Sequence, residues 1–382
     1  MRKIAVGDLK DGMIFSAPVY IHGNSQLVAA GIPLQQKDID RLQSWGIETV
    51  ETEGESVGGF DEDKGESANP AASSLFDALE DDEVYHKYVD IIQRLDAICK
   101  SIVMGVPIEA RLIDSIVGQL LMAVRDQRSL YISYILGGNV QGHYLAKSLV
   151  NTAILSASMA VEMKLPHHRV LHIVTGAVLH DIGMLKVPKE IVEKKGSLSP
   201  LELQKMQTHP LYAYKIVSQE LMYPPEVGEI VIQHHERWDG EGYPQRISRA
   251  MINIGARIVS VADAFEAMVS KKSYRNSLIG YNALKNLIAD NMRRFDPEVI
   301  KIFVQTMGIY PIGSIVFLNN GAMARVISTQ SLAPIRPMVS ILVDEHGKVF
   351  KPDEGAKIDL LCEKSLFIAK AVDEKEAAAK YA

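Results

Sequence analysis

The chain has 382 residues, of which 47% are hydrophobic and 23% are charged, and its formal net charge is −6. This length and composition exclude a disordered chain and allow two or three domains with at least one large core. The negative charge excludes a general affinity for nucleic acid or for an acidic membrane, so we expect no DNA or RNA partner. An anionic ligand must therefore be met by a local cluster of cations.

Targeting signals and cysteine content predict a cytoplasmic protein. The N-terminal sequence MRKIAVGDLK lacks the apolar segment of a signal peptide, and no run of about 18 apolar residues predicts a membrane span. The two cysteines, Cys99 and Cys362, lie far apart in the chain, and each falls in an apolar pattern. That usage is typical of a reducing compartment, and we expect both thiols to lie in a hydrophobic core.

The first 51 residues predict a small α/β or mostly β accessory module. Short apolar runs alternate with turn signals there, and a helical pattern with Ile39, Leu42 and Trp45 ends at Gly46. Residues 52–74 are acidic and rich in Gly and Ser, with too few apolar groups to offset the entropy of ordering. We interpret this second segment as a flexible linker.

Residues 75–310 have the pattern of a helical domain. Apolar residues recur at helical spacing from Val84 to Ile98 and from Ile113 to Leu121, which predicts two amphipathic helices. Core packing is the simplest role for these helices, and a dimerisation arm or a transmitter from the N-terminal module is the alternative. Four more helices are predicted: from about 142 to 163, up to His180, from Ser199 to His209-Pro210, and up to His234. A further helix carries Asp263.

Imidazole and carboxylate side chains recur along these later helices. The residues are His180, Asp181, His209, His234, His235 and Asp263. Any one of these histidines would more often be structural, but six such residues on consecutive buried helices favour a metal centre in the bundle core. Without cysteine, the set suits Fe, Mn, Zn or Ni. Two ions about 3.5 to 4 Å apart, bridged by an Asp, would hold a hydroxide and clamp a phosphoryl group.

The loop HHERWDGEGYP, residues 234–244, follows the last pair of histidines directly. Its two glycines allow close approach of the backbone, and Tyr243 can stack on a base, so the loop suits a nucleotide. An ordinary Gly-Pro turn is the alternative. From residue 311 to 371 strand-like runs alternate with turns such as Asn319-Asn320-Gly321, which predicts a small β-rich appendage. Residues 372–382 resemble a frayed helical tail.

Together these motifs resemble the HD-GYP family, a branch of the HD-domain phosphohydrolases. The resemblance is carried by HDIG at 180–183, THP at 208–210, HHERWDGEGYP at 234–244 and VADAFEAM at 261–268, and it covers roughly residues 140–305. It implies a mainly α fold, in which a helical catalytic domain carries a small α/β N-terminal module and the β-rich C-terminal appendage. It also implies two divalent metal ions, most often iron or manganese, and hydrolysis of cyclic di-GMP to linear pGpG or GMP.

By position, the resemblance also implies roles for individual residues. Asp181 would bridge the two metals and take part in catalysis, with the other five residues named above as further ligands. The substrate pocket would be formed by Arg237, Gly242, Tyr243 and Pro244. Lys272 and Arg275 would contact the phosphates, since Lys271-Lys272-Ser273-Tyr274-Arg275 replaces the family's more usual Asp-Arg-Pro-Tyr-Arg.

Two departures from the family pattern predict reduced activity. Ser148 occupies the position of a metal-binding His, and Tyr144 replaces the acidic residue one turn earlier, which disfavours a third metal. Met184 replaces the Lys that normally ends the HDxGK motif, so Lys186, two residues on, is expected to protonate the leaving oxygen. These losses keep two alternatives open. One is a weak or inactive protein that binds cyclic di-GMP or a protein partner, and the other is an enzyme for a different phosphorylated substrate.

The sequence also leaves open how the protein associates with itself or with other proteins. The long helices before the catalytic domain make a homodimer plausible, and the N-terminal module is a candidate surface for protein partners.

Overall fold

The computed structural model describes most of the helical and C-terminal regions and part of the N-terminal module. The described residues are 2–9, 13, 15–21, 25–28, 34, 39, 42, 47, 49–54, 83–137, 143–194, 196–270, 280–290, 293–350 and 354–372. Most of the expected linker, the tail from residue 373 on, Trp45, Lys272 and Arg275 lie outside this set. The described residues fall into two compact units, 1–68 and 69–382. The domain boundaries expected from the sequence stay a prediction.

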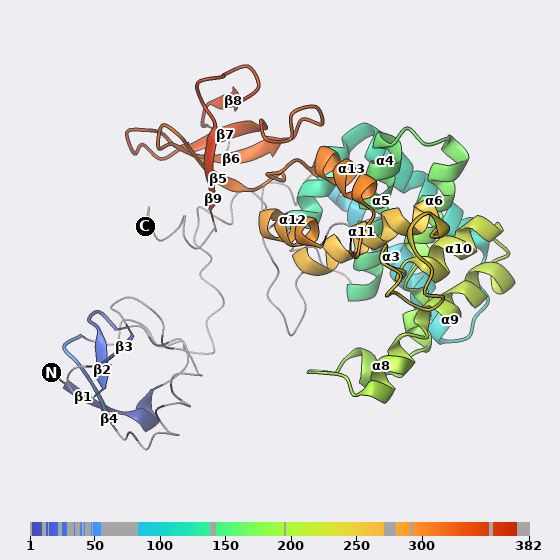
Figure 1. The fold of residues 1–382 in the computed structure, drawn as a ribbon, viewed down its shortest axis with the longest axis horizontal. Coiled ribbons are helices and arrows are strands. Elements are labelled where there is room, and N and C mark those ends of the chain that lie inside the picture. The colour runs from blue at the N-terminus through green and yellow to red at the C-terminus, as the bar shows by residue number, and fades with distance from the viewer. Residues whose placement is uncertain are drawn as a thin grey trace. The chain divides into compact units, whose positions relative to one another are not determined.

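The first unit is built on a four-stranded antiparallel sheet (Figure 1). Its strands are β1 (Arg2–Ala5), β2 (Val19–Ile21), β3 (Ser25–Val28) and β4 (Thr49–Thr52), in the order β1-β4-β2-β3. A short 3₁₀ turn, η1 (Val6–Asp8), follows β1. Phe15, Val19, Leu34, Leu42 and Val50 form its small core. The unit is a small strand module, as the sequence predicts.

The second unit begins with a helical bundle. Its helices are α3 (Glu83–Val103), α4 (Ala110–Gly137), α5 (Tyr144–Glu162), α6 (His167–Leu179), α7 (Lys189–Val192), α8 (Pro200–Met206), α9 (His209–Lys215), α10 (Pro225–Gln233), α11 (Ile254–Val269), α12 (Gly280–Ala289) and α13 (Pro297–Met307). Shorter turns are η2 (Ile182–Lys186), the π-helical η3 (Ile216–Glu220) and η4 (Arg249–Met251). The mainly α fold is therefore confirmed.

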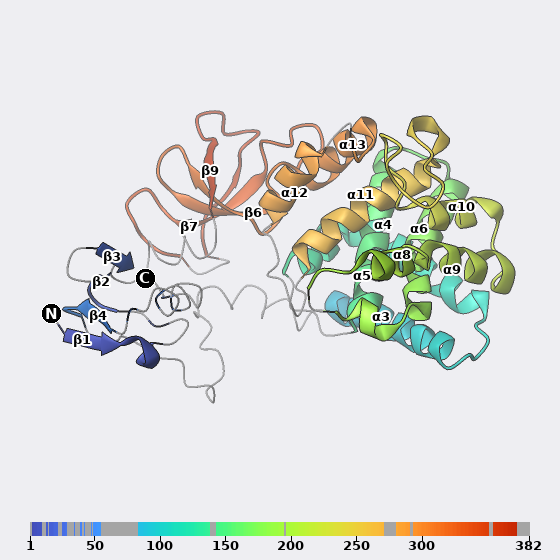
Figure 2. The same ribbon diagram turned by 60° about the horizontal axis from the view of Figure 1, so that its bottom comes forward.

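Helix α5 is the central helix of the bundle. It packs against α3, α4, α6, α11 and α13, and both ribbon views draw it inside the bundle (Figures 1 and 2). Among the described helices it is the one whose length and composition would allow it to cross a membrane, but 83% of that apolar window is buried in the protein. Its place in the core explains its apolar composition, because neighbouring helices cover it on all sides.

The helix that was expected to reach His209 is in fact two helices. Ser199 caps α8 in a capping box with Glu202, as the sequence predicts, but α8 ends at Met206. A turn at Gln207-Thr208 follows, and His209 then begins α9 with Pro210 in its first turn. Proline is favoured at that place because its missing N–H has no partner within the helix anyway. The break places His209 at the start of a helix instead of the end of one.

The C-terminal part of the second unit is a five-stranded antiparallel sheet, in the order β8-β7-β6-β5-β9. Its strands are β5 (Ile315–Leu318), β6 (Met323–Ser328), β7 (Met338–Val343), β8 (Lys357–Asp359) and β9 (Ile368–Val372). This is the expected β-rich appendage. Cys362 lies in the turn after β8 and is exposed, so the prediction that both cysteines are core residues is wrong for Cys362 and right for Cys99. The apolar pattern around Cys362 belongs to a turn whose backbone is bonded to Asp359.

Candidate metal centre

The first two candidate ligands lie where α6 ends. His180 is the C-cap of α6, and its Nδ1 atom lies 2.7 Å from the carbonyl oxygen of Ala177. A carbonyl can only accept a hydrogen bond, so Nδ1 carries the proton of the neutral imidazole, and Nε2 is the atom that can bind a cation. Nε2 faces Asp181 Oδ2 and Asp263 Oδ1, each at 3.7 Å. Asp263 reaches this point from the middle of α11, not from a helix end.

Gly183 allows α9 to approach the end of α6. A Cβ atom on Gly183 would overlap the carbonyl oxygen of His209 and would lie 2.6 Å from the amide nitrogen of Ala213. Gly183 adopts no left-handed conformation and lies inside η2, so it is not a helix C-cap. Its role is to leave room for the first turn of α9. His209 is thereby brought next to Asp181.

The histidines of α9 and α10 are oriented in the same way as His180. Nδ1 of His209 donates to the carbonyl of Met206 at 2.8 Å, and Nδ1 of His234 donates to the carbonyl of Val231 at 2.6 Å. Their Nε2 atoms therefore carry no proton, yet they lie only 3.4 Å apart. Asp181 Oδ1 lies 3.0 Å from the Nε2 atom of His209 and 3.4 Å from that of His234. Three lone pairs thus converge, and a cation between them removes their repulsion.

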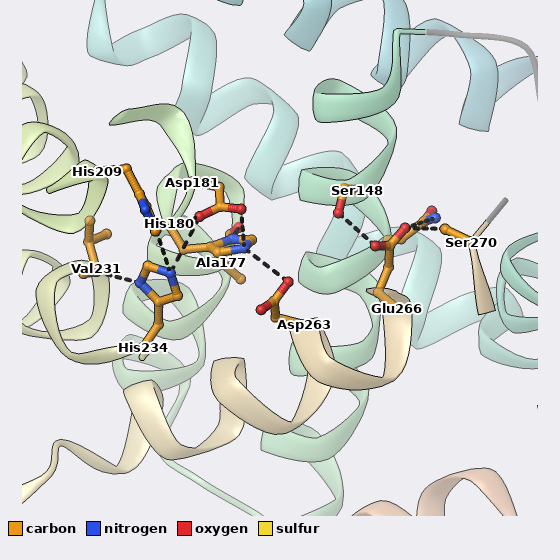
Figure 3. Close-up of polar contacts among 11 residues, drawn as sticks. Ser148, Ala177, His180, Asp181, His209, Val231, His234, Asp263, Glu266 and Ser270 are labelled. Carbon is orange, nitrogen blue, oxygen red and sulfur yellow. Dashed lines mark hydrogen bonds and ion pairs between the residues drawn. The ribbon is translucent and has the colours of Figure 1, made fainter. Parts of the chain in front are cut away.

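The six predicted ligands are all brought together, in two groups that share one residue. Figure 3 shows His180, Asp181, His209, His234 and Asp263. Asp181, His209, His234 and His235 form one group, and Asp181, His180 and Asp263 form the other. Within each group the donor atoms lie within 4.8 Å of one another. Two of these atoms, His180 Nε2 and Asp181 Oδ1, are fully buried and accept no hydrogen bond from the described residues. Nitrogen and oxygen donors of this kind are those of a divalent-metal site.

The charges of the cluster are strongly coupled. Burial lowers the pKa of His180, but the carboxylates of Asp181 and Asp263 outweigh it and raise that pKa to about 9. Burial raises the pKa of Asp181, but His180 and His209 hold it well below its usual value. Burial and the neighbouring imidazoles lower the pKa of His235 well below its usual value. Asp181 is therefore a carboxylate and His235 a neutral imidazole, which are the forms that bind metal.

Ser148 does not face this cluster. Its Oγ atom donates a 2.6 Å hydrogen bond to Glu266, one turn beyond Asp263 on α11 (Figure 3). Glu266 is fully buried, and it also accepts hydrogen bonds from Asn151 at 3.1 Å and from Ser270. The position at which the family resemblance implies a metal-binding His is thus part of a separate buried hydrogen-bond network.

The loop after His235 is held close to the metal cluster. A Cβ atom on Gly242 would lie 2.5 Å from the Cα atom of Glu236 and 2.6 Å from the carbonyl oxygen of His235, so only glycine fits there. The next residue, Tyr243, stacks its ring on that of His235, with the centroids 4.7 Å apart. One face of Tyr243 is therefore covered by the His235 ring.

A pocket of about 370 Å³ opens onto the cluster at His235. Among the predicted substrate-binding residues, Arg237, Gly242 and Tyr243 line it. Lys186 is exposed at the end of η2, and neither it nor Pro244 is part of the lining. The catalytic role of Lys186 stays a prediction, as do the contacts of Pro244. Arg237 is bonded to Asp239 at 2.6 and 3.0 Å, which raises the pKa of the guanidinium.

The lining also contains residues that sequence reasoning missed, namely Asp290, Arg293 and Arg294. They lie between α12 and α13, about 50 residues after the loop that they face, and they match no metal or phosphate motif. The adjacency of Arg293 and Arg294 in the sequence RRFDP was the available signal for the two arginines. Glu266 was missed as well, although its place in VADAFEAM, three residues after Asp263, puts both residues on one side of α11.

Comparison with known proteins identifies two regions of the chain. Residues 132–299 match the HD domain family, and residues 315–380 match a KOW domain associated with HD domains. Cyclic di-GMP phosphodiesterase PdeB of Borreliella burgdorferi is 28% identical over 246 residues, which are 64% of this chain and 64% of the relative. A cyclic di-GMP phosphodiesterase of Thermotoga maritima is 37% identical over 152 residues, 40% of this chain and 41% of the relative.

A third relative is named for a different substrate. The 3′3′-cGAMP-specific phosphodiesterase 2 of Vibrio cholerae is 34% identical over 128 residues, 33% of this chain and 24% of the relative. This chain therefore spans less than two thirds of the length of each of these relatives.

Proposed function

Because residues 132–299 match the HD domain family, we propose that the chain is a metal-dependent phosphodiesterase. Its substrate would be cyclic di-GMP, which it would hydrolyse to linear pGpG, to GMP, or to both. The observation that carries the proposal is the convergence of five nitrogen and oxygen ligands on Asp181, next to a pocket that begins at His235. The relatives that are named cyclic di-GMP phosphodiesterases support the choice of substrate.

Two divalent cations, iron or manganese, fit the two ligand groups. His209, His234 and His235 would hold one cation, His180 and Asp263 would hold the other, and Asp181 would bind both. When bound, such cations supply Lewis acidity to a phosphodiester and neutralise the charge that builds on its oxygens. The carbonyls of Ala177, Met206 and Val231 fix the tautomers of three imidazoles before any metal arrives.

The chain's own residues also shape the place where the substrate binds. His180 and His234 are fully buried, so the interior side of the cluster is closed to water, and His235 is the ligand that meets the pocket. Gly242 keeps the loop backbone close to His235, and Tyr243 forms the wall beside it. A phosphodiester that enters the pocket would therefore meet the cluster from the His235 side. Lys186, or solvent in its place, would protonate the leaving oxygen.

The test is product analysis by chromatography. The protein is purified without oxygen, loaded with Fe(II) or Mn(II), and incubated with cyclic di-GMP. We expect linear pGpG or GMP to appear with the wild type, to disappear on chelation, and to be absent with Asp181→Ala. Product formation that survives chelation, or that is unchanged in Asp181→Ala, would show that the reaction does not depend on the metal cluster.

The same assay decides the alternative, a weak or inactive HD-GYP protein that binds cyclic di-GMP or a protein partner. Ser148 and Met184 are the residues that motivate it, since each replaces a functional residue in the family pattern. Cyclic di-GMP that is bound but recovered intact would favour a receptor. If the missing Lys limits turnover, Met184→Lys should then raise the rate. An equal rate in that variant would show that position 184 does not limit the reaction.

Three further proposals concern the setting of the protein. A cytoplasmic location accords with the two cysteines, which form no disulfide. A homodimer through the long helices α3 and α4, and protein partners of the N-terminal module, remain the two proposed modes of association. Size-exclusion chromatography with light scattering distinguishes a dimer from a monomer directly.

A further inference from the structure

We infer that Arg294 and Asp290, with Arg293 beside them, form a guanine-recognition site at the outer side of the pocket. The inference rests on the proposed function, because it names the part of the substrate that these residues would read. A cyclic dinucleotide whose phosphodiester lies at the cluster must place a base along the pocket that leads away from His235. Asp290, Arg293 and Arg294 line that pocket together with His235 and Tyr243.

The segment that carries the two arginines is fixed against the loop after His235. The amide of Trp238 donates to the carbonyl of Arg294 at 3.0 Å, and the amide of Asp239 donates to the carbonyl of Arg293 at 2.9 Å. The amide of Arg294 donates in turn to the carbonyl of Asp290 at 3.1 Å. These are backbone bonds, so the side chains of all three residues are left for other contacts. Substituting the side chains does not remove the bonds.

The guanidinium groups of Arg293 and Arg294 are available to a ligand. Both residues are exposed, and among the described residues no carboxylate lies within ion-pair distance of either one. The third arginine of the pocket, Arg237, is already bonded to Asp239, and Glu241 lies 3.6 Å from it. Arg294 lies with its guanidinium carbon 5.0 Å from the centroid of the Phe295 ring, which holds its side chain in place.

The carboxylates in the same pocket favour a base over a phosphate as the group that the arginines bind. Glu241 and Asp290 line the pocket beside the arginines, and a phosphate, which only accepts hydrogen bonds, would be repelled by them. Guanine has both kinds of group. Its O6 and N7 atoms accept two hydrogen bonds from an arginine, and its N1–H and N2–H₂ groups donate two to a carboxylate. Adenine offers neither of these two-bond pairings, because its N6 amino group lies where guanine has O6, and its N1 is an acceptor.

Three carboxylates line the pocket, and Asp290 is the best acceptor for guanine among them, because Glu236 is buried and already accepts from the amides of Gln245 and Arg246. Glu241 lies within ion-pair distance of Arg237, whereas the described residues include no such partner for the Asp290 side chain. Asp290 also lies on the same segment as Arg294, four residues before it, at the end of α12. One short segment therefore presents a donor pair and an acceptor pair to one base. One relative is named for cyclic di-GMP and another for 3′3′-cGAMP, and these substrates differ in one base. The choice of base is therefore the property to measure.

The test compares cyclic di-GMP, 3′3′-cGAMP and cyclic di-AMP on the full-length, Mn(II)-loaded protein. The quantity measured is the ratio of kcat/KM values between dinucleotides, together with the ratio of Kd values from calorimetry. Because a well-made pair of bonds to a base discriminates by about 1 to 3 kcal/mol, we expect the wild type to prefer cyclic di-GMP over cyclic di-AMP by about 10-fold or more. Arg294→Gln and Asp290→Asn should each reduce that ratio toward one.

The matched control is Arg246→Gln. Arg246 is exposed in the segment between α10 and η4, does not line the pocket, and contributes its backbone amide to Glu236, a bond that the substitution keeps. We expect it to preserve the base preference, which excludes a general effect of losing one positive charge. Equal weakening of all three dinucleotides by Arg294→Gln would identify a phosphate contact and overturn the inference. A wild type without base preference would also overturn it.

Failure of the proposed function gives a different result from failure of this inference. If no dinucleotide is hydrolysed but the Kd ratio favours cyclic di-GMP and falls in Arg294→Gln, the recognition site stands and the hydrolase does not. If dinucleotides are hydrolysed at equal rates, the hydrolase stands and the recognition site does not.

Discussion

Ser148 on α5 and Glu266 on α11 are joined by a 2.6 Å hydrogen bond, although they are 118 residues apart in the chain. Glu266 is fully buried, and Asn151, which also donates to it, accepts in turn from the hydroxyl of Tyr88 on α3. A buried carboxyl group needs such donors, because leaving its oxygens without partners is costly. The network thus links α3 and α5 to the helix that carries Asp263.

We therefore predict that Ser148→Ala destabilises the protein without removing metal. Loss of one donor to a buried carboxyl group should lower the free energy of unfolding by about 1 to 2 kcal/mol, measured by urea denaturation. Ser158→Ala is the matched control, since Ser158 is buried on the same helix but its hydroxyl only bonds back to Ile154. That variant should change stability by less than about 0.5 kcal/mol. Equal effects of the two substitutions would show that the bond to Glu266 contributes nothing.

A second prediction concerns the close packing of Gly183 against α9. Gly183→Ala would force its Cβ atom into the carbonyl of His209, so α9 must move and His209 must leave its place beside Asp181. We expect a loss of about 1 to 3 kcal/mol in stability, as for other overpacked sites, and at least a 10-fold weaker affinity for Mn(II).

Gly118→Ala is the control for that variant. Gly118 lies inside α4 with nothing within 4 Å of the added Cβ atom. Alanine should be neutral there or stabilise the helix by up to about 1 kcal/mol. If Gly183→Ala keeps full metal affinity, the approach of α9 is not what positions His209.

A third prediction follows from the sharing of Asp181 by the two ligand groups. Asp181→Ala should abolish binding at both groups, whereas Asp263→Ala should remove only the ligand group that contains His180. Metal analysis by mass spectrometry after gel filtration should then give close to no metal for the first variant and about half the wild-type content for the second. Equal metal contents in the two variants would contradict the sharing.

A fourth prediction uses the two thiols. Burial raises the pKa of Cys99 to about 12, so at pH 8 it is a protonated, inaccessible thiol, whereas Cys362 is exposed. A thiol reagent should label the Cys99→Ser variant rapidly and the Cys362→Ser variant only after denaturation. Mn(II) should slow the labelling of Cys99 further, because metal that binds only the folded state reduces its opening. Rapid labelling of Cys99 in the folded protein would contradict the packing of α3.

The convergence of the six side chains could be predicted from the sequence, because they recur at intervals that match successive helices. The partner of Ser148 could not, because hydrogen bonds between residues 118 positions apart depend on how α5 and α11 cross. The break after Met206 was missed for a related reason. The helical pattern continues through Gln207, and Pro210 together with the packing of α9 against Gly183 accounts for the new helix that starts at His209. Arg294 was missed because base recognition by one arginine has no spacing signature.

The most direct measurement of the central claim is a crystal structure of the Mn(II)-loaded protein with an anomalous difference map. We expect two peaks about 3.5 to 4 Å apart, with Asp181 between them. His209, His234 and His235 should surround one peak, and His180 and Asp263 should surround the other. No peak at Asp181, or a peak whose ligands come from outside these six residues, would contradict it.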